Sequence, residues 1–422
     1  MSILNVNRIQ PVGSGQTVTI NAANISAGSA TVTAGTFSGN LSGNVNSTGV
    51  TTVTTLNATS IVGVTTAGIT TAYIGSVNDG PISGARNRII NGDMRLDQRN
   101  VGASLTLNAT SQYPVDRFPS YKGTSSATVT AQRSTTAPSG FTNSIIFTAS
   151  TGATPAIGDI NAFWQSIEGF NVADLGWGTS SAQSITMSFW VRSSVIGTYS
   201  FSLNNNASNR FYVATYVVNA ANTWEYKTVT IAGDTSGTWL TDNSTGIQIT
   251  WDLGYGTNFN GTAGSWGSST IRRTSGSVQW IATTGATFYI TGVQLESGTV
   301  ATPFERRSYG QELALCQRYY AKSYKQSVVP GSNDGDGCSV FYSHTSGSYT
   351  INGNIIFPVE MRSEPAVSIW SNTGTSGQLT ASDSIAKSGT PGAISQRQCS
   401  MNVTSGNNNV TYRCQWVSSI EL

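Results

Sequence analysis

Between residues 184 and 296, short runs of the chain alternate apolar with polar side chains, and this period of two limits the possible folds more than any other feature. Runs such as "SITMSFWVRSS", "RFYVATYVVN" and "GIQITWDL" are rich in aromatic and β-branched residues, and no long amphipathic helix lies between them. The pattern predicts strands that each bury one face. The chain is therefore expected to form an all-β sandwich.

The predicted strands span residues 184–194, 197–205, 210–219, 224–233, 246–253, 278–282 and 286–296. Their number suits a jelly roll, in which two antiparallel sheets pack face to face. The alternation predicts seven positions in the core or on a sheet surface, namely Phe189, Val191, Tyr212, Ile249, Trp251, Tyr289 and Val293.

The segment before residue 80 differs from the rest of the chain in composition and in the spacing of its apolar residues. No charged side chain occurs from Ile9 to Asn78, and from Val32 to Ile69 an apolar residue recurs every three to five positions among Thr, Ser, Asn and Gly. Such a segment has too little apolar surface for a core of its own, and its Gly and Thr content disfavours a helix. We expect a fibrous β-rich shaft of a homotrimer, because repeats that cannot bury a face alone must associate. Low-complexity disorder is the alternative.

Composition narrows the functional classes. The 422 residues carry a formal net charge of +2, and charged residues are only 10% of the chain, without a run of Lys or Arg. Nucleic acid is therefore not an expected partner. No apolar run approaches the ~18 residues that span a bilayer, and the start lacks the order of a signal peptide. We expect that the protein is synthesised in a cytoplasm and does not insert into a membrane.

The cysteines are Cys316, Cys338, Cys399 and Cys414, and no two of them form a CxxC pair. Their irregular spacing argues against zinc. Buried reduced thiols are expected, with a disulfide formed after release as the alternative.

Charged residues reappear abruptly in "RNRIINGDMRLDQR" at residues 86–99. The part from Ile89 to Met94 resembles the first strand of jelly-roll carbohydrate-binding modules, "MSFWVRSS" resembles their middle strand, and "TFYITGVQLE" resembles their last strand. The resemblance implies one closed domain in which the first and last strands lie near each other. It also implies a structural calcium ion, but Thr291 and Gly292 replace the acidic pair that would join Asp93. No cofactor is therefore expected, and calcium stays open.

Longer stretches resemble tail fibres and related appendage proteins of bacteriophages. They include "NRIINGDMRLDQRN", "YPVDRF", "QSIEGFNVADLGWGT" and "GVQLESGTVATPFERRSYGQELALCQRYY". The last stretch implies a short helix that joins the jelly roll to a β-rich tip, and the start "MSILNVNRIQP" resembles the part of phage fibres that docks on the virion. The resemblance implies a place on the exterior of the virion and, as partners, tail, neck or head proteins.

Together these observations predict five segments. They are a virion-docking segment (1–30), a fibrous shaft (31–80), a jelly-roll carbohydrate-binding-like domain (81–308), a helical linker (309–325) and a C-terminal β-rich tip (326–422). Within the tip, "FPVEMRSEPAV" resembles a recurring stretch of phage fibre tips, where Glu360 and Arg362 either form a receptor surface or fix a contact between protomers.

Catalysis is not expected. The single histidine, His344, lies in "YSHTSGS" without a nucleophile elbow. Glycosidase chemistry would need two carboxyl groups about 5 to 10 Å apart across a cleft. The carboxylate pairs that remain open are Glu168 with Asp174 and Asp234 with Asp252.

The predicted function is host attachment by a phage fibre that binds cell-surface polysaccharide. Aromatic rings are the expected contacts, because a flat π face matches the C–H bonds of a pyranose. The candidate residues are Trp239, Tyr255, Trp266, Tyr342, His344, Tyr349 and Trp370. Two alternatives stay open: a purely structural head, neck or collar fibre, and a glycan-depolymerising tailspike.

Overall fold

The computed structural model describes residues 86–422 except 125, 344–346, 383–384 and 407–408. The predicted docking segment and shaft, residues 1–80, lie outside the described residues. By its contacts the chain divides into residues 1–71 and 72–422, and everything described below belongs to the second unit.

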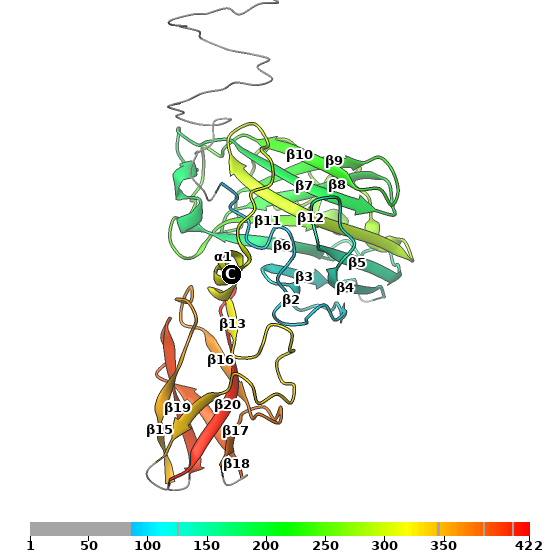
Figure 1. The fold of residues 1–422 in the computed structure, drawn as a ribbon. Coiled ribbons are helices and arrows are strands. Elements are labelled where there is room, and N and C mark those ends of the chain that lie inside the picture. The colour runs from blue at the N-terminus through cyan, green and yellow to red at the C-terminus, as the bar shows by residue number, and fades with distance from the viewer. Residues whose placement is uncertain (1–85, 125, 344–346, 383–384, 407–408) are drawn as a thin grey trace, which may run out of the picture. The chain divides into compact units, whose positions relative to one another are not determined.

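The all-β prediction is confirmed, because two six-stranded antiparallel sheets form a sandwich (Figure 1). The first sheet has the order β1 (Leu105–Thr106), β4 (Thr128–Ser134), β5 (Ser144–Thr151), β12 (Ala286–Ser297), β7 (Ile185–Ser193) and β10 (Glu225–Ile231). The second has the order β2 (Gln112–Val115), β3 (Phe118–Lys122), β6 (Asn161–Glu168), β11 (Thr245–Asp252), β8 (Gly197–Asn204) and β9 (Phe211–Val218). The chain crosses repeatedly between the sheets, as in a jelly roll.

The core lies between the two sheets and is rich in aromatic rings. Phe163 is fully buried and stacks on Trp251, with ring centroids 5.1 Å apart, and on Phe147, at 4.8 Å. Of the positions predicted from the alternation, six are buried: Phe189, Val191, Tyr212, Ile249, Trp251 and Val293. Tyr289 lies half-buried on the opposite face of its sheet, where its ring is 6.0 Å from that of Trp224.

Two predicted strands are not strands. Residues 278–282 contain the 3-10 helix Trp280–Ala282, in which Trp280 and Ile281 are both buried, so that this segment adds to the core without pairing into either sheet. Residues 86–94 have irregular backbone, with Asn91 and Met94 at positive φ.

The segment 86–94 nevertheless runs beside β12, as the resemblance implied. The amide of Val293 donates to the carbonyl of Gly92 at 2.9 Å, and the amide of Arg88 donates to the carbonyl of Leu295 at 2.9 Å. The approach requires glycine, because a Cβ atom on Gly92 would lie 2.2 Å from the Val293 carbonyl oxygen.

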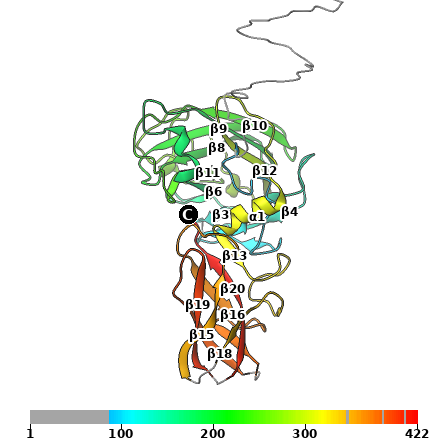
Figure 2. The same ribbon diagram turned by 60° about the vertical axis from the view of Figure 1, so that its left-hand side comes forward.

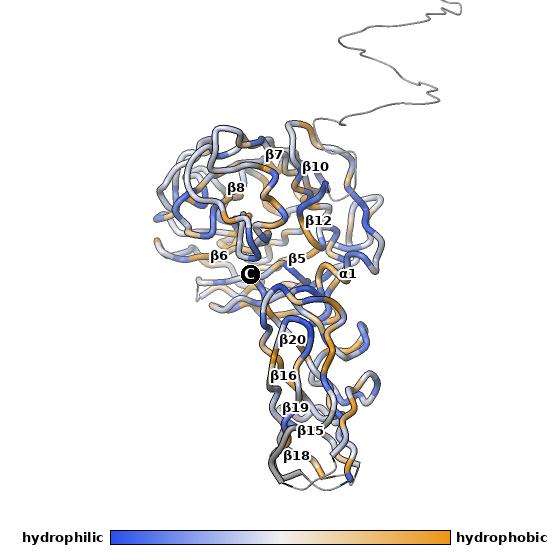
Figure 3. Tube along the Cα trace, turned by 90° about the vertical axis from the view of Figure 1, so that its left-hand side faces the viewer, coloured by the Kyte–Doolittle hydropathy of each residue, from blue (hydrophilic) through white to orange (hydrophobic). Residues whose placement is uncertain are grey.

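A short helix, α1 (Tyr309–Gln317), follows the sandwich inside the predicted linker. The hydroxyl of Ser308 caps it by accepting the amide hydrogen of Gln311. Glu312 lies in its first turn, where a negative charge is favourable. Among the described helices, none is both long and apolar enough to cross a bilayer. Figure 3 shows hydrophobic and hydrophilic stretches interleaved along the described chain.

The C-terminal region forms a third sheet (Figures 1 and 2). Its strands are β13 (Tyr320–Lys322), β14 (Ser339–Tyr342), β15 (Gly347–Ile356), β16 (Ala366–Trp370), β17 (Gln378–Ala381), β18 (Ala386–Gly392), β19 (Gln398–Gly406) and β20 (Thr411–Ser419). They enclose a core that includes Phe341, Met401 and Tyr412.

All four cysteines are unpaired in the structure. Cys316, Cys399 and Cys414 are buried, whereas Cys338 is half-buried. Burial raises the pKa of Cys399 to about 11, so that its thiol is neutral near pH 7.

A cluster of buried charges joins the C-terminal residues to the sandwich. The carboxylate of Glu421 accepts hydrogen bonds from Arg99, at 2.7 Å, and from Arg117. The guanidinium of Arg99 also lies 3.7 Å from the ring centroid of Tyr320, and that of Arg117 lies 3.4 Å from the centroid of Tyr319. We call these two arginines and Glu421 the Glu421 clamp.

Candidate functional site

The outer face of the second sheet carries a hollow of about 200 Å³. Trp164 of β6 lies on this face, because its neighbour Phe163 points into the core and successive side chains on a strand alternate. Register brings the flanking residues together, since Thr250 is paired with Trp164 and Tyr121 with Ala162. We call this the sheet-face hollow; its lining is Tyr121, Ile160, Trp164, Gln248, Thr250 and Tyr255.

Two aromatic side chains of the hollow have neither a hydrogen-bond partner nor a ring partner among the described residues. Trp164 and Tyr121 are half-buried, and among the described residues neither side chain forms a hydrogen bond or a ring contact. A half-buried indole N–H and phenol O–H without an acceptor are open to a ligand. The two rings therefore present both a π face and a polar edge to solvent.

Polar groups surround these rings at fixed positions. The amide of Gln248 donates to the hydroxyl of Ser166 at 3.3 Å, which leaves its carbonyl oxygen as an acceptor. The carbonyl of Tyr255 accepts from Arg273 at 2.7 Å and from Gln279 at 3.0 Å, which holds that residue in place. Burial raises the pKa of the Tyr255 phenol to about 12, so that it remains a hydrogen-bond donor at neutral pH.

Two of the sequence candidates, Trp239 and Trp266, lie together in a separate cluster. Their rings are 5.3 Å apart, and each also packs edge-on against Trp177, at 4.7 and 5.2 Å. All three indole N–H groups donate to backbone carbonyls, those of Gln183, Ser236 and Ala232. Both candidates are half-buried, and Trp239 with Trp177 lines a second hollow of about 190 Å³.

The contacts of this tryptophan cluster favour a structural role for most of its surface, because its faces meet one another and its polar edges are satisfied. Trp177 was not singled out in the sequence. The three tryptophans come from loops that are far apart in the sequence, and only the fold brings them together. Tyr255, the third candidate of the sandwich, is buried in the sheet-face hollow instead.

The candidates of the tip are spread out. Tyr342 of β14 is 57% exposed, and Trp370 of β16 is half-buried with its ring 6.5 Å from that of Tyr324. His344 and the side chain of Tyr349 lie outside the described part of the chain. These four assignments stay predictions.

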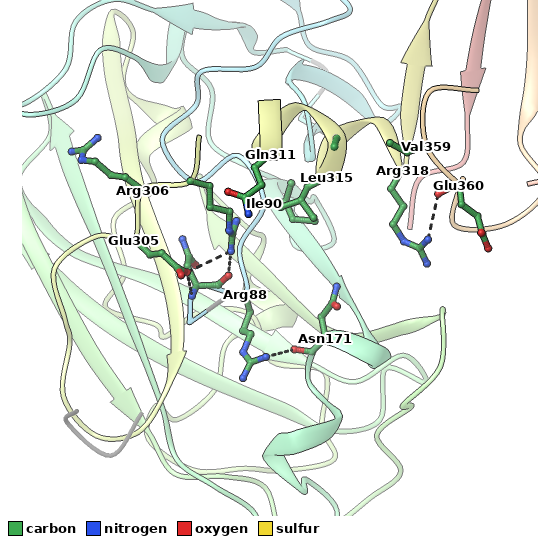
Figure 4. A pocket seen from close by; sticks show the side chains of 13 residues that line it. Arg88, Ile90, Asn171, Glu305, Arg306, Gln311, Leu315, Arg318, Val359 and Glu360 are labelled. Carbon is green, nitrogen blue, oxygen red and sulfur yellow. Dashed lines mark hydrogen bonds and ion pairs between the residues drawn. The ribbon is translucent and has the colours of Figure 1, made fainter. Parts of the chain in front are cut away.

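A larger hollow, of about 570 Å³, lies beside α1 and is rimmed by arginines (Figure 4). Arg88 donates to the carbonyl of Asn171 and forms an ion pair of 2.6 Å with Asp174, and Arg318 holds Glu168 by two hydrogen bonds of 2.7 and 2.8 Å. Since these cations are already paired within the chain, this hollow is a structural junction.

The carboxylates considered for catalysis each pair with an arginine. Glu168 pairs with Arg318 and Asp174 with Arg88, as above; Asp234 pairs with Arg210 at 2.7 Å, and Asp252 lies 3.5 Å from Arg273. Burial raises the pKa of Asp252 to about 6 against the opposing charge of Arg273. These contacts account for all four carboxylates structurally.

Asp93, the residue considered for a calcium ion, and Glu296 on β12 both have partners within the chain. Asp93 forms an ion pair with Arg95. On β12, the buried carboxylate of Glu296 accepts from Gln294, at 2.9 Å, and from the amide and hydroxyl of Thr302, at 2.8 and 2.7 Å. The described residues contain no group of three side chains suited to hold a metal ion.

The stretch with Glu360 and Arg362 forms contacts within the chain. Arg362 donates to the carbonyls of Asn243, Ile420 and Glu421, and Asn243 donates back to the Arg362 carbonyl at 3.0 Å. Arg362 therefore acts as a link between the third sheet and the sandwich, which neither sequence interpretation anticipated. Glu360 pairs with Arg397 on the surface.

No family model and no curated protein sequence matches this chain. Among solved structures, it is similar to the enzymatically active domain of tailspike protein 4 of bacteriophage CBA120, with 14% identity over 51% of this chain and a TM-score of 0.26. The match covers 22% of that tailspike domain.

Two further similar structures are smaller proteins. One is a putative sugar-binding protein from Bacteroides thetaiotaomicron, with 11% identity, 50% of this chain and 99% of that chain covered, and a TM-score of 0.28. The other is a family 11 carbohydrate-binding module from Clostridium thermocellum, with 14% identity, 47% and 98% covered, and a TM-score of 0.25.

Sequence reasoning missed Trp164 and Tyr121. The signal was present, because "NAFWQSIE" (161–168) alternates like the other strands and places Trp164 opposite the core residue Phe163. The sequence pattern did not show that β6 pairs with β3 and β11, and this pairing places Tyr121 and Thr250 beside Trp164.

Proposed function

We propose that this protein is a homotrimeric fibre on the exterior of a bacteriophage, and that it binds host surface polysaccharide through the sheet-face hollow. The fibre assignment rests on the sequence resemblance and on the charge-free repeats before residue 80. In this proposal residues 1–30 dock on a tail, neck or head protein of the virion. Several fibres per particle would raise avidity without strong individual sites.

The observation that carries the glycan proposal is the half-buried Trp164 beside Tyr121, both without a protein partner among the described residues. In this proposal the C–H face of a pyranose stacks on the indole of Trp164, and the hydroxyl groups of the sugar form hydrogen bonds with Gln248 and the phenol of Tyr255. The tryptophan cluster supports such a role less well, because its rings and indole N–H groups already have partners.

The test replaces Trp164 by Ala in the full-length protein and measures binding to oligosaccharides prepared from the host surface by titration calorimetry. An aromatic anchor at the centre of a site contributes ~2 kcal/mol or more, so the dissociation constant should rise about thirtyfold. Trp224→Ala is the matched control, because Trp224 is also half-buried but lies beside Tyr289 on the other sheet. Equal affinity of both variants and the parent would refute the sheet-face site.

A second experiment separates receptor binding from a purely structural fibre. Antibody to residues 326–422 and the variant Trp164→Ala should each be tested for loss of phage adsorption. If neither affects adsorption, the structural head, neck or collar fibre is the better proposal. If the antibody abolishes adsorption while phage with Trp164→Ala still adsorbs, the receptor site belongs to the tip.

A further inference from the structure

A second aromatic groove lies on the first sheet, on the opposite side of the sandwich from the sheet-face hollow. Its volume is about 450 Å³, within the range of small-ligand sites. It is formed by two pairs of aromatic rings on either side of a bulge in β12. We call it the bulge groove.

The first pair of rings comes from neighbouring strands. Trp190 of β7 and Tyr226 of β10 are directly opposite each other in the register, and their ring centroids are 5.4 Å apart with 45° between the planes. Tyr226 is 44% exposed and Trp190 is half-buried. This pair forms an open aromatic surface rather than part of the core.

The second pair, Phe141 and Phe304, comes from loops at the other wall, with centroids 5.2 Å apart in an edge-to-face arrangement. Between the walls, β12 bulges after Thr291 and Gly292 adopts φ +62°. A Cβ atom there would lie 2.7 Å from the Phe141 ring and 3.2 Å from that of Trp190. Glycine therefore keeps the floor of the groove open.

One charge lines the groove, and it is positive. Arg306 lies with its guanidinium 4.7 Å from the centroid of Phe141 and 5.7 Å from that of Phe304. It is exposed, and it donates to the carbonyl of Gly140 at 2.5 Å. Figure 4 shows its side chain extending away from Arg88 and Glu305. The other lining residues include no acidic side chain.

We propose that the bulge groove binds a sugar ring that carries a carboxylate, as in an acidic polysaccharide. The ring would lie on Trp190 and Tyr226, and its carboxylate would pair with the N–H groups of Arg306 that do not donate to Gly140. The aromatic wall under the guanidinium limits its rotation and so reduces the entropy lost on pairing. This proposal rests on the proposed glycan-binding function and defines a second, chemically distinct site.

The test uses the full-length protein, with tetragalacturonate as the acidic probe and cellotetraose as the neutral one. Arg306→Gln should weaken tetragalacturonate binding at least tenfold and leave cellotetraose unchanged, and the parent's affinity for tetragalacturonate should fall with added salt. Trp190→Ala should weaken tetragalacturonate binding to a similar extent. Trp224→Ala is the control and should bind like the parent, because Trp224 lies just before β10, beside Tyr289, and outside the lining of the groove.

The outcomes distinguish this site from the sheet-face hollow. Unchanged tetragalacturonate binding in the exposed variant Arg306→Gln, which is not expected to disturb folding, would overturn the proposal. Loss of all binding in Trp164→Ala alone would also overturn it while supporting the proposed function. If Trp190→Ala changes the oligomeric state in light scattering without affecting tetragalacturonate binding, a second copy of the chain covers the groove, and the proposal is again wrong.

Discussion

Removing the charge of Glu421 should destabilise the protein far more than removing an exposed carboxylate. Glu421 has 10% of its side chain exposed, and its arginine partners Arg117 and Arg99 have 3% and 14%. In Glu421→Gln, Arg117 loses its carboxylate partner in a site closed to water, whereas Arg99 keeps Asp116 at 3.2 Å. Breaking a buried ion pair by removing one partner costs about 3 to 5 kcal/mol. Because Asp116 compensates in part, we expect about 3 kcal/mol.

The measurement is thermal unfolding of the full-length variants at one protein concentration, since oligomers unfold in a concentration-dependent manner. A loss of about 3 kcal/mol corresponds to a decrease in Tm of roughly 6 to 12 °C for domains of this size. The control is Glu360→Gln, whose partner Arg397 is 77% exposed and whose own side chain is 45% exposed. Surface pairs contribute about 0 to 1 kcal/mol. A Tm for Glu421→Gln close to that of Glu360→Gln would refute the clamp as a stabilising element.

Three further predictions concern the same protein. Burial alone would raise the pKa of Glu421, but the charges of Arg117 and Arg99 outweigh this effect and hold the pKa below its usual value. The carboxylate therefore stabilises the folded protein fully above about pH 4.3, and this stabilisation is lost as the pH falls through the folded pKa. The Tm values of the parent and Glu421→Gln should converge in acid, and a difference that stays constant with pH would contradict this. Phe163→Ala removes a ring that is fully buried and should cost about 3 to 5 kcal/mol in urea unfolding, whereas Phe170→Ala, 60% exposed, should change stability by less than about 0.5 kcal/mol. Gly92→Ala forces the 86–94 segment away from β12 and should cost about 1 to 3 kcal/mol, and an unchanged unfolding midpoint would contradict the close approach.

The alternation of apolar and polar side chains was a good guide to where strands lie. Alternation predicted residues 184–194 and 246–253, and the structure has β7 at Ile185–Ser193 and β11 at Thr245–Asp252. It failed at 278–282, where the chain forms a 3-10 helix instead of pairing into a sheet. The strand that the resemblance to carbohydrate-binding modules implied at Ile89–Met94 is also absent, because the backbone there is irregular although this segment bonds to β12. In both places long-range packing outweighs the local preference.

The sequence by itself determined that the chain is β-rich and where several of its strands lie, because alternation depends on residues only a few positions apart. The tertiary structure decided which side chains meet. Arg99 and Arg117 pair with Glu421 across 322 and 304 positions of the chain, and Tyr121 reaches Trp164 only because β3 pairs with β6. No local pattern encodes such contacts, because each depends on the order of the strands in a sheet and on which face of the sheet each side chain occupies.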